Sequence, residues 1–237
     1  MREWIEHYRF HGVEHFYIID DGSTDNTVAI LQEYVEKGVV TLFLAKWQVY
    51  LGRQRDMYTR YILPHLCETQ WLLMVDLDEF VWSPKDIDLR NILQRCTHLA
   101  QIQFGLTLYG SNGHIQQPKS LVAGFTKRTL LQPTDKCYKY FVQSNYKYTS
   151  LNINFATFQD KSDETGKFVI LGPEYFRLNH YRCQSREFWN NVKCTRGDGD
   201  AYCVRTPGDF EDLDRNQVED LELLKQNESL LTSLALL

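Results

Sequence analysis

The sequence predicts an α/β fold in which a mostly parallel sheet is flanked by helices. Strand-like and helix-like segments alternate through the first half of the chain, as in βαβ units around parallel strands. The chain has 237 residues, of which 43% are hydrophobic, and this is enough for the core of one domain. Acidic residues follow two of the expected strands, at the edge where open α/β sheets bind ligands.

The first elements alternate clearly. The chain opens on an amphipathic helix pattern over 1–8, whose apolar side chains Trp4, Ile5 and Tyr8 share one face. The apolar run at 16–19 predicts a strand. The N-capping residue types at 23–26 then predict the start of a helix at 27–35. A second strand is expected at 39–44, where β-branched residues lead an apolar run.

The next elements continue this alternation. We expect a helix at 53–62, a buried strand in the apolar run 71–75, and a helix at 88–95. Residues 101–104 alternate between polar and apolar, which predicts a strand with one polar face.

The second half has a different pattern. Residues 105–162 are rich in Gly, Asn, Thr and Tyr with short alternating runs, which predict hairpins and long loops. Residues 216–234 indicate a polar helix with an apolar tail. With no internal repeat or low-complexity linker, we expect a single domain over 1–237, with a βα half at 1–104 and a loop-rich half at 105–237.

Charge and cysteine content exclude several classes of protein. The net charge is -5 and no basic block occurs, so we expect no nucleic-acid partner. No run of 18 apolar residues occurs, so we expect no membrane segment in this chain. The six cysteines contain no Cys-x-x-Cys pair, which argues against a zinc module or a dense disulfide framework.

The most informative motif is Asp76-Leu77-Asp78-Glu79, directly after the apolar run 71–75. Neighbouring carboxylates repel one another, so a chain that gathers three of them is expected to neutralise them with a hard divalent cation such as Mn²⁺ or Mg²⁺. Such an ion would bridge the phosphates of a substrate.

A second constellation, Asp20 to Thr27, leads from the first strand into a helix. Its backbone amides and the positive end of the helix dipole can face a ligand, and Asp20 and Asp21 can accept hydrogen bonds from ribose or a base. The alternative is a plain capped turn. In a parallel sheet, this loop and the acidic motif lie on the same edge.

Taken together, these motifs resemble GT-A glycosyltransferases of the family 92 type and their family 2-like relatives. The resemblance spans nearly the whole chain and rests on an ordered set of segments: Glu3-Trp4-Ile5-Glu6-His7, Gly12-Val13, the loops at 20–27 and 76–80, Phe104-Gly105, Gly110 to His114, Leu178 to Tyr181, and Ser185, Glu187, Phe188, Arg196 and Gly197. It implies a GT-A fold with a nucleotide-binding first half and an acceptor-binding second half. Relatives begin with a strand before the Glu3 helix, so we expect the first strand to be missing.

The resemblance also implies roles for individual residues. Asp76, Asp78 and the C-terminal His180 match the ligands of a Mn²⁺ or Mg²⁺ ion on the diphosphate of a nucleotide sugar. Asp20 and Asp21 match the nucleoside loop. Arg53 and Arg55 match a segment beside the diphosphate, although both would also suit a solvated helix face.

The sequence does not identify a single catalytic base. Its candidates are Glu79, Glu187, Asp160, Asp163 and Glu164, with Glu79 and Glu187 taken as the catalytic pair. Relatives have a histidine where this chain has Asn154, which puts activity in question. Cys183, Cys194 and Cys203 fit no zinc module and are read as buried thiols or local disulfide partners.

The resemblance implies transfer of a hexose from a nucleotide sugar, such as UDP-galactose, to a glycan or glycoconjugate acceptor with inversion. The alternative is a decayed module that binds nucleotide or sugar without turnover. A haloacid-dehalogenase-type phosphatase also uses Asp-x-Asp after a strand, but Phe80 stands where that motif needs Thr or Val. Behind an upstream membrane anchor, the Golgi lumen is expected, with Asn227-Glu228-Ser229 as a possible glycosylation site.

Overall fold

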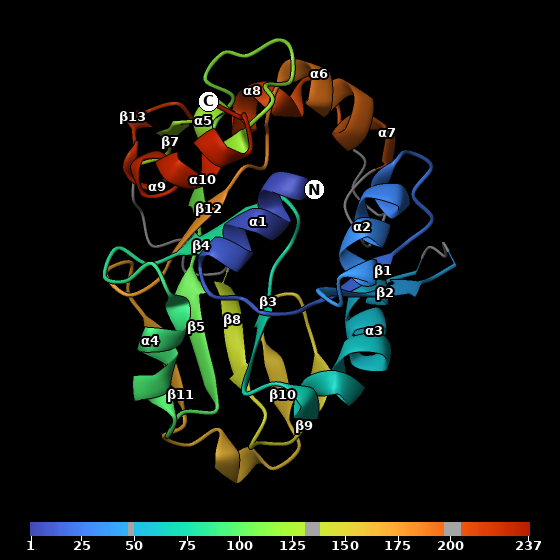
Figure 1. The fold of residues 1–237 in the computed structure, drawn as a ribbon, viewed down its shortest axis with the longest axis vertical. Helices are drawn as coiled ribbons and strands as arrows, with labels where there is room; N and C mark the ends of the chain where they lie inside the picture. Colours follow the sequence, from blue (N-terminus) through green and yellow to red (C-terminus); the bar gives the residue numbers. More distant parts are fainter. Residues whose placement is uncertain (47–49, 131–137, 197–204) are drawn as a thin grey trace.

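The computed structural model describes residues 1–46, 50–130, 138–196 and 205–237 (Figure 1). Its α-helices are α1 (Arg2–Phe10), α2 (Thr27–Glu36), α3 (Arg53–Met57), α4 (Leu89–Leu93), α5 (Leu121–Gly124), α6 (Arg186–Phe188), α7 (Cys194–Arg196), α8 (Asp209–Leu213), α9 (Glu222–Gln226) and α10 (Glu228–Ser233). Its strands are β1 (Phe16–Asp20), β2 (Val40–Leu44), β3 (Trp71–Met74), β4 (Glu79–Trp82), β5 (Gln101–Gly105), β6 (Thr107–Leu108), β7 (Lys127–Arg128), β8 (Tyr138–Gln143), β9 (Tyr148–Leu151), β10 (Ala156–Phe158), β11 (Phe168–Leu171), β12 (Arg177–His180) and β13 (Val218–Glu219).

The α/β fold class is confirmed, but the prediction of a mostly parallel sheet was wrong. The central sheet has the order β11-β5-β8-β3, and β8 is antiparallel to both of its neighbours. A second sheet, β4-β12-β6, is also mixed, while β1 and β2 form a separate parallel pair. The reason is that β8 returns from the loop-rich half and inserts between two strands of the first half.

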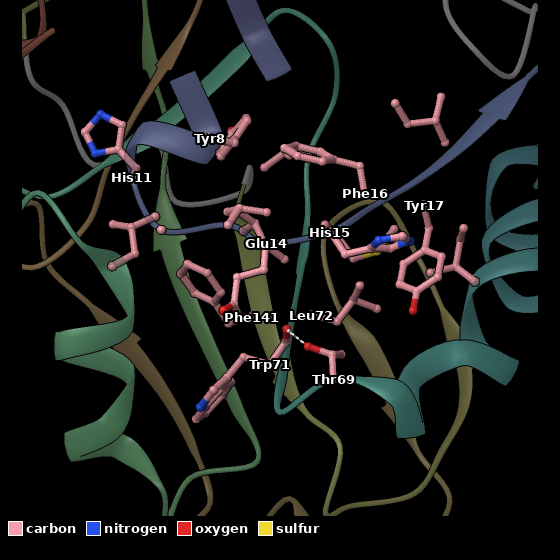
Figure 2. A pocket seen from close by; sticks show the side chains of 18 of the residues that line it. Tyr8, His11, Glu14, His15, Phe16, Tyr17, Thr69, Trp71, Leu72 and Phe141 are labelled. Carbon is pink, nitrogen blue, oxygen red and sulfur yellow. Dashed lines mark hydrogen bonds between the residues drawn. The ribbon is translucent and has the colours of Figure 1, made fainter. Parts of the chain in front are cut away.

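A cavity of about 1020 Å³ separates β1 from β3 (Figure 2). Both strands line it along their lengths, at 16–19 and 71–74. Helix α1 contributes Trp4 and Tyr8, and the segment after Gly52 contributes Gln54, Tyr58 and Ile62.

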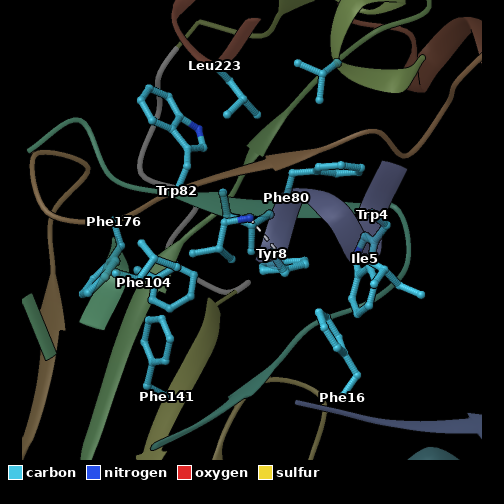
Figure 3. Packing of buried hydrophobic residues seen from close by; sticks show 14 of the residues in the cluster. Trp4, Ile5, Tyr8, Phe16, Phe80, Trp82, Phe104, Phe141, Phe176 and Leu223 are labelled. Atoms are coloured by element: carbon cyan, nitrogen blue, oxygen red, sulfur yellow. Dashed lines mark hydrogen bonds between the residues drawn. The ribbon is translucent and has the colours of Figure 1, made fainter. Parts of the chain in front are cut away.

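Two hydrophobic clusters form the core, one on each face of the layer made by the central sheet and the β1-β2 pair. The larger cluster joins α1 to the sheets through Trp4, Tyr8 and Phe80, and it includes Phe104 and Phe141 of the central sheet (Figure 3). The predicted apolar face of the opening helix is therefore confirmed. The second cluster packs Ile62, Leu66, Leu72 and Met74 against the inner side chains of β8 and β9.

Two predicted helices are interrupted. The helix expected at 53–62 begins as α3 and continues as a π-helical turn at Tyr58–Ile62. The helix expected at 216–234 starts with strand β13 and then divides into α9 and α10 at Asn227.

The break at Asn227 is set by a buried hydrogen-bond network. The Asn227 amide donates to His7 Nδ1 at 2.9 Å, and Asn227 Oδ1 lies 2.9 Å from His11 Nε2. Asn227 is fully buried, so the prediction that this sequon is available for glycosylation is wrong for the folded chain. In the part of the chain that the structure describes, no helix is long and apolar enough to cross a membrane.

Candidate functional site

Helix α1 clamps the turn that carries the acidic motif. Trp4 Nε1 donates to the carbonyl oxygens of Asp76 and Glu79, at 3.1 and 3.0 Å. The Tyr8 hydroxyl donates to the same Glu79 carbonyl at 3.0 Å. Inside the turn, the Asp76 amide donates to Glu79 Oε2 at 2.8 Å. Helix α1 thus fixes the backbone of the turn from which the carboxylates project.

Lys139 neutralises two of the three carboxylates. Its Nζ lies 2.7 Å from Asp76 Oδ2 and 3.1 Å from Glu79 Oε2. The Lys139 side chain is 4% exposed and that of Glu79 is 1% exposed. Burial and the nearby Asp76 charge raise the pKa of Glu79 to about 7, although Lys139 acts in the opposite direction. Glu79 therefore points into the protein interior.

Asp78 pairs instead with His180 and Lys193. His180 reaches it because β12 pairs with β4, placing His180 opposite Glu79. His180 Nε2 lies 3.6 Å from Asp78 Oδ1, and Lys193 Nζ lies 3.2 Å from Asp78 Oδ2. Burial acts to raise the pKa of Asp78, but the two cationic neighbours outweigh it and hold that pKa well below its ordinary value. Burial acts to lower the pKa of His180, and Asp78 with Glu79 raises it.

The fit of this cluster to a divalent cation is partial. Asp78 and His180 face one another, and a carboxylate with an imidazole is a donor pair that Mn²⁺ accepts. His180 Nδ1 is buried without a hydrogen-bond partner. Asp76, however, turns to Lys139. Across the described ranges, no three His, Cys, Asp or Glu side chains lie close enough together to hold a metal ion.

Of the residues predicted to contact the nucleoside and diphosphate, Asp20 and Arg53 are buried, whereas Arg55 is exposed. Asp20 is buried, and its carboxylate accepts from the Gly22 and Ser23 amides, as in a plain capped turn. Arg53 is buried and forms an ion pair with Asp21. Arg55 is about half exposed and pairs with its neighbour in the chain, Asp56. Arg55 therefore lies on a solvated helix face, which was the alternative expected for both arginines, and Arg53 does not.

Helix α3 connects the two constellations. Arg53 at its start holds Asp21, while Gln54 and Tyr58 line the same cavity as Asp76. The Asp76 and Glu79 charges contribute, after burial, to raising the pKa of Tyr58. The helical segment that begins with α3 therefore pairs with Asp21 and shares a cavity with Asp76.

Three of the remaining base candidates pair with residues outside this cluster. Glu187, on α6, is exposed and accepts from the Gln117 amide at 2.8 Å. Asp160 caps the turn at Ser162, and Asp163 pairs with Lys167. The Asp160 and Asp163 contacts are local, whereas the Glu187 contact joins residues 70 positions apart in the chain.

The sequence pattern did not identify two residues of this cluster, Lys139 and Lys193. The signal for Lys139 was a lysine inside the otherwise uncharged strand 138–143, which a buried carboxylate partner explains. For Lys193 no signal was visible in the sequence, because its place beside Asp78 depends on how α6 and the π-helical turn Trp189–Lys193 lie against the sheet.

The cysteine and asparagine predictions have separate outcomes. Cys183 is a buried free thiol, and Cys194 is a free thiol that is partly buried. Cys203 and Gly197 lie outside the described residues. At Asn154, where the resemblance leads us to expect a histidine, the backbone carbonyl accepts from the Gln103 side chain at 2.8 Å, so this backbone makes a structural contact.

Comparison with known proteins gives one family. The model of glycosyltransferase family 92 matches residues 1–196. A glycosyltransferase family 92 protein of Oryza sativa subsp. japonica is 25% identical over 196 residues, which cover 81% of this chain and 32% of that protein. The chain thus spans about a third of the length of this curated relative. The crystal structure of S. aureus TarS 1-349 matches 91% of this chain and 62% of its own chain with 12% identity, and the TM-score is 0.35.

Proposed function

Because the chain belongs to glycosyltransferase family 92, we propose that it transfers a hexose from a nucleotide sugar to a hydroxyl group of a glycan or glycoconjugate. A UDP-hexose such as UDP-galactose is the proposed donor, and inversion at the anomeric carbon is the proposed stereochemical course. The observation that best supports this proposal is the pair formed by Asp78 and His180, which come from distant segments and meet beside Lys193.

The proposed metal ligands are Asp78 and His180. Asp76 would join them if its carboxylate turned from Lys139 to the metal ion. A bound Mn²⁺ or Mg²⁺ would supply positive charge that stabilises the leaving nucleoside diphosphate. Lys193 is the cation best placed to contact the diphosphate, because it already lies beside Asp78 and is partly exposed. Arg53, buried against Asp21, would orient the nucleoside loop.

Glu79 serves in this proposal as a positioning residue and not as the base. Its carboxylate accepts from the Asp76 amide and pairs with Lys139, and it is almost completely buried. Its proposed role is to stabilise the conformation of the turn at 76–79. Glu187 stays a candidate base, because its exposed carboxylate is open to solvent on α6.

The experiment is a donor-hydrolysis assay on the chain with UDP-galactose and UDP-glucose, in Mn²⁺, Mg²⁺ or a chelator. Asp78→Asn should lower turnover by about 100-fold, because the amide removes charge at the reacting diphosphate. The control is Asp56→Asn, an exposed carboxylate paired with Arg55, which should leave turnover unchanged. The anomeric configuration of the first product, read by proton NMR, tests inversion.

Two outcomes would contradict the proposal. Equal turnover in Asp78→Asn and the unchanged chain would remove the acidic motif from the reaction. Tight nucleotide binding without any hydrolysis or transfer would instead support the binding module without turnover.

A further inference from the structure

The C-terminal segment 205–237 lies outside the region that matches the family model, which ends at residue 196. It nevertheless belongs to the core, because Leu223 of α9 and Leu231 of α10 are buried in the larger hydrophobic cluster. Figure 3 shows Leu223 in the same cluster as Trp82 of β4. Strand β13 also pairs with β7, so the segment joins the rest of the chain through backbone contacts as well.

Strands β4 and β12 form the ladder that brings Asp78 and His180 together. The register places His180 at one end of this ladder and Arg177, opposite Trp82, at the other end. The Tyr181 amide donates to the Asp78 carbonyl at 2.8 Å, so the backbone contact between the two segments reaches Asp78 itself. The separation of the Asp78 carboxylate from the His180 ring therefore depends on the position of β12 relative to β4.

The C-terminal segment holds β12 through Asp220. The Asp220 carboxylate is 2% exposed and pairs with Arg177 of β12 and with Arg128 of β7, the latter at 2.6 Å. Glu222 supplies a second carboxylate, 2.8 Å from Arg177 Nη1. The Arg177 guanidinium also lies over the Trp82 ring, 4.7 Å from the ring centre. Asp220 thus fixes the side chain that joins one end of β12 to β4.

The same segment holds β4 through Asn227 and helix α1. The Asn227 amide donates to His7 Nδ1, and His7 Nε2 donates to the Val81 carbonyl at 2.9 Å. The Tyr8 hydroxyl donates to the Glu79 carbonyl and accepts from the Val81 amide, each at 3.0 Å. Successive strand residues direct their backbone groups to opposite sides, so these α1 side chains satisfy the edge of β4 that faces away from β12.

We propose that Asp220 and Asn227 are positioning residues for the pair formed by Asp78 and His180. Asp220 holds β12 directly, and Asn227 acts on β4 through His7, so the two residues hold the two strands of one ladder. Both are buried, and fully paired buried polar groups favour one arrangement of the elements they join. The consequence for turnover rests on the proposed function, whereas the consequence for the ladder does not.

The first test reads the ladder by residue-resolved amide exchange on the chain without ligand. The reporter is the Tyr181 amide, which donates to Asp78, and the reference is the Val142 amide of the central strand β8. In Asp220→Asn and in Asn227→Ala, the ratio of the Tyr181 rate to the Val142 rate should rise by roughly tenfold. The ladder then opens locally while the central sheet does not.

The matched control is Leu231→Ala, which removes a fully buried side chain of the same segment and leaves the contacts of Asp220 and Asn227 in place. The cavity destabilises the whole chain, so both amides should exchange faster and their ratio should stay the same. Glu222→Gln is a milder variant that applies even where Asp220→Asn does not fold. It removes the 60% exposed partner of Arg177 and should raise the ratio by roughly twofold.

The second test reads the site by hydrolysis of UDP-galactose at a temperature where every variant is folded. In Asp220→Asn and in Asn227→Ala, kcat should fall by about tenfold or more, while KM for the donor should change by less than about twofold. A displaced pair loses contacts made in the transition state more than contacts that bind the donor. Leu231→Ala should leave both constants unchanged.

Two outcomes would overturn the positioning role. An exchange ratio that stays the same in Asp220→Asn and Asn227→Ala, or that rises equally in Leu231→Ala, would mean that the segment only stabilises the fold. A kcat that falls equally in all three variants would have the same meaning. If the unchanged chain hydrolyses no donor, the proposed function is contradicted, and the exchange ratio alone decides whether Asp220 and Asn227 position the ladder.

Discussion

Replacing Lys139 with methionine should destabilise the chain strongly, because the lysine is the buried counterion of the acidic motif. Its Nζ lies 2.7 Å from Asp76 and 3.1 Å from Glu79, and both Lys139 and Glu79 are almost completely buried. Methionine has a similar length and keeps the apolar packing of the stem. What it removes is the charge, so Glu79 becomes a buried carboxylate without a counterion.

The expected cost is about 3–5 kcal/mol, the range for breaking a buried ion pair from one side. This is a large share of the roughly 5–15 kcal/mol that stabilises a typical domain. The control is Lys167→Met. Lys167 also lies 2.7 Å from a carboxylate, that of Asp163, but its side chain is 38% exposed. A surface pair contributes about 0–1 kcal/mol, so the control isolates the effect of burial.

The cost should also depend on pH. The pKa of Glu79 is raised to about 7 from an ordinary value of 4.5, so the folded chain binds a proton that the unfolded chain releases between these values. The stabilisation from this proton is fully present below about pH 4.5 and is lost as pH rises through 7. Without Lys139 the pKa of Glu79 should rise further. The cost of Lys139→Met should therefore be smaller at pH 5.5 than at pH 8.

The assay is urea unfolding followed by circular dichroism at both pH values. Adding Glu79→Gln to Lys139→Met should recover part of the lost stability, since the buried charge is then gone. A cost below about 1 kcal/mol, equal to that of Lys167→Met and unchanged with pH, would show that the Lys139 ion pair is not a buried one.

Three further predictions concern other buried groups. Burial holds the pKa of His7 well below 6.5, so the unfolding free energy should fall by up to about 1.4 kcal/mol per pH unit as pH drops below 6.5; His7→Gln should make this slope shallower, and an unchanged slope would contradict the assignment. By calorimetry, Arg53→Ala should weaken UDP binding by about tenfold and the exposed Arg55→Ala should not, so equal losses would remove the distinction between them. Asn227→Ala should cost about 2–3 kcal/mol in urea unfolding, because two buried histidines lose a partner, whereas the exposed Asn190→Ala should cost less than about 0.5 kcal/mol.

Local sequence determined most of the elements in the first half. The apolar face of α1, the strands β1 and β2, and the strand before the acidic motif were all predictable, because their side-chain periodicity matches the surface they bury. The acidic motif and the matching family segments also pointed to the family to which the chain belongs. The break at Asn227 was not predictable, since its cause is a pair of hydrogen bonds to residues 220 and 216 positions away in the chain.

Tertiary structure decided how the charges of the site are balanced. The sequence showed three neighbouring carboxylates and led to the expectation of a cation, but it could not show that Lys139 and Lys193 lie beside them. Both contacts join distant segments, and electrostatic attraction depends on separation in space and on burial, neither of which a sequence pattern contains.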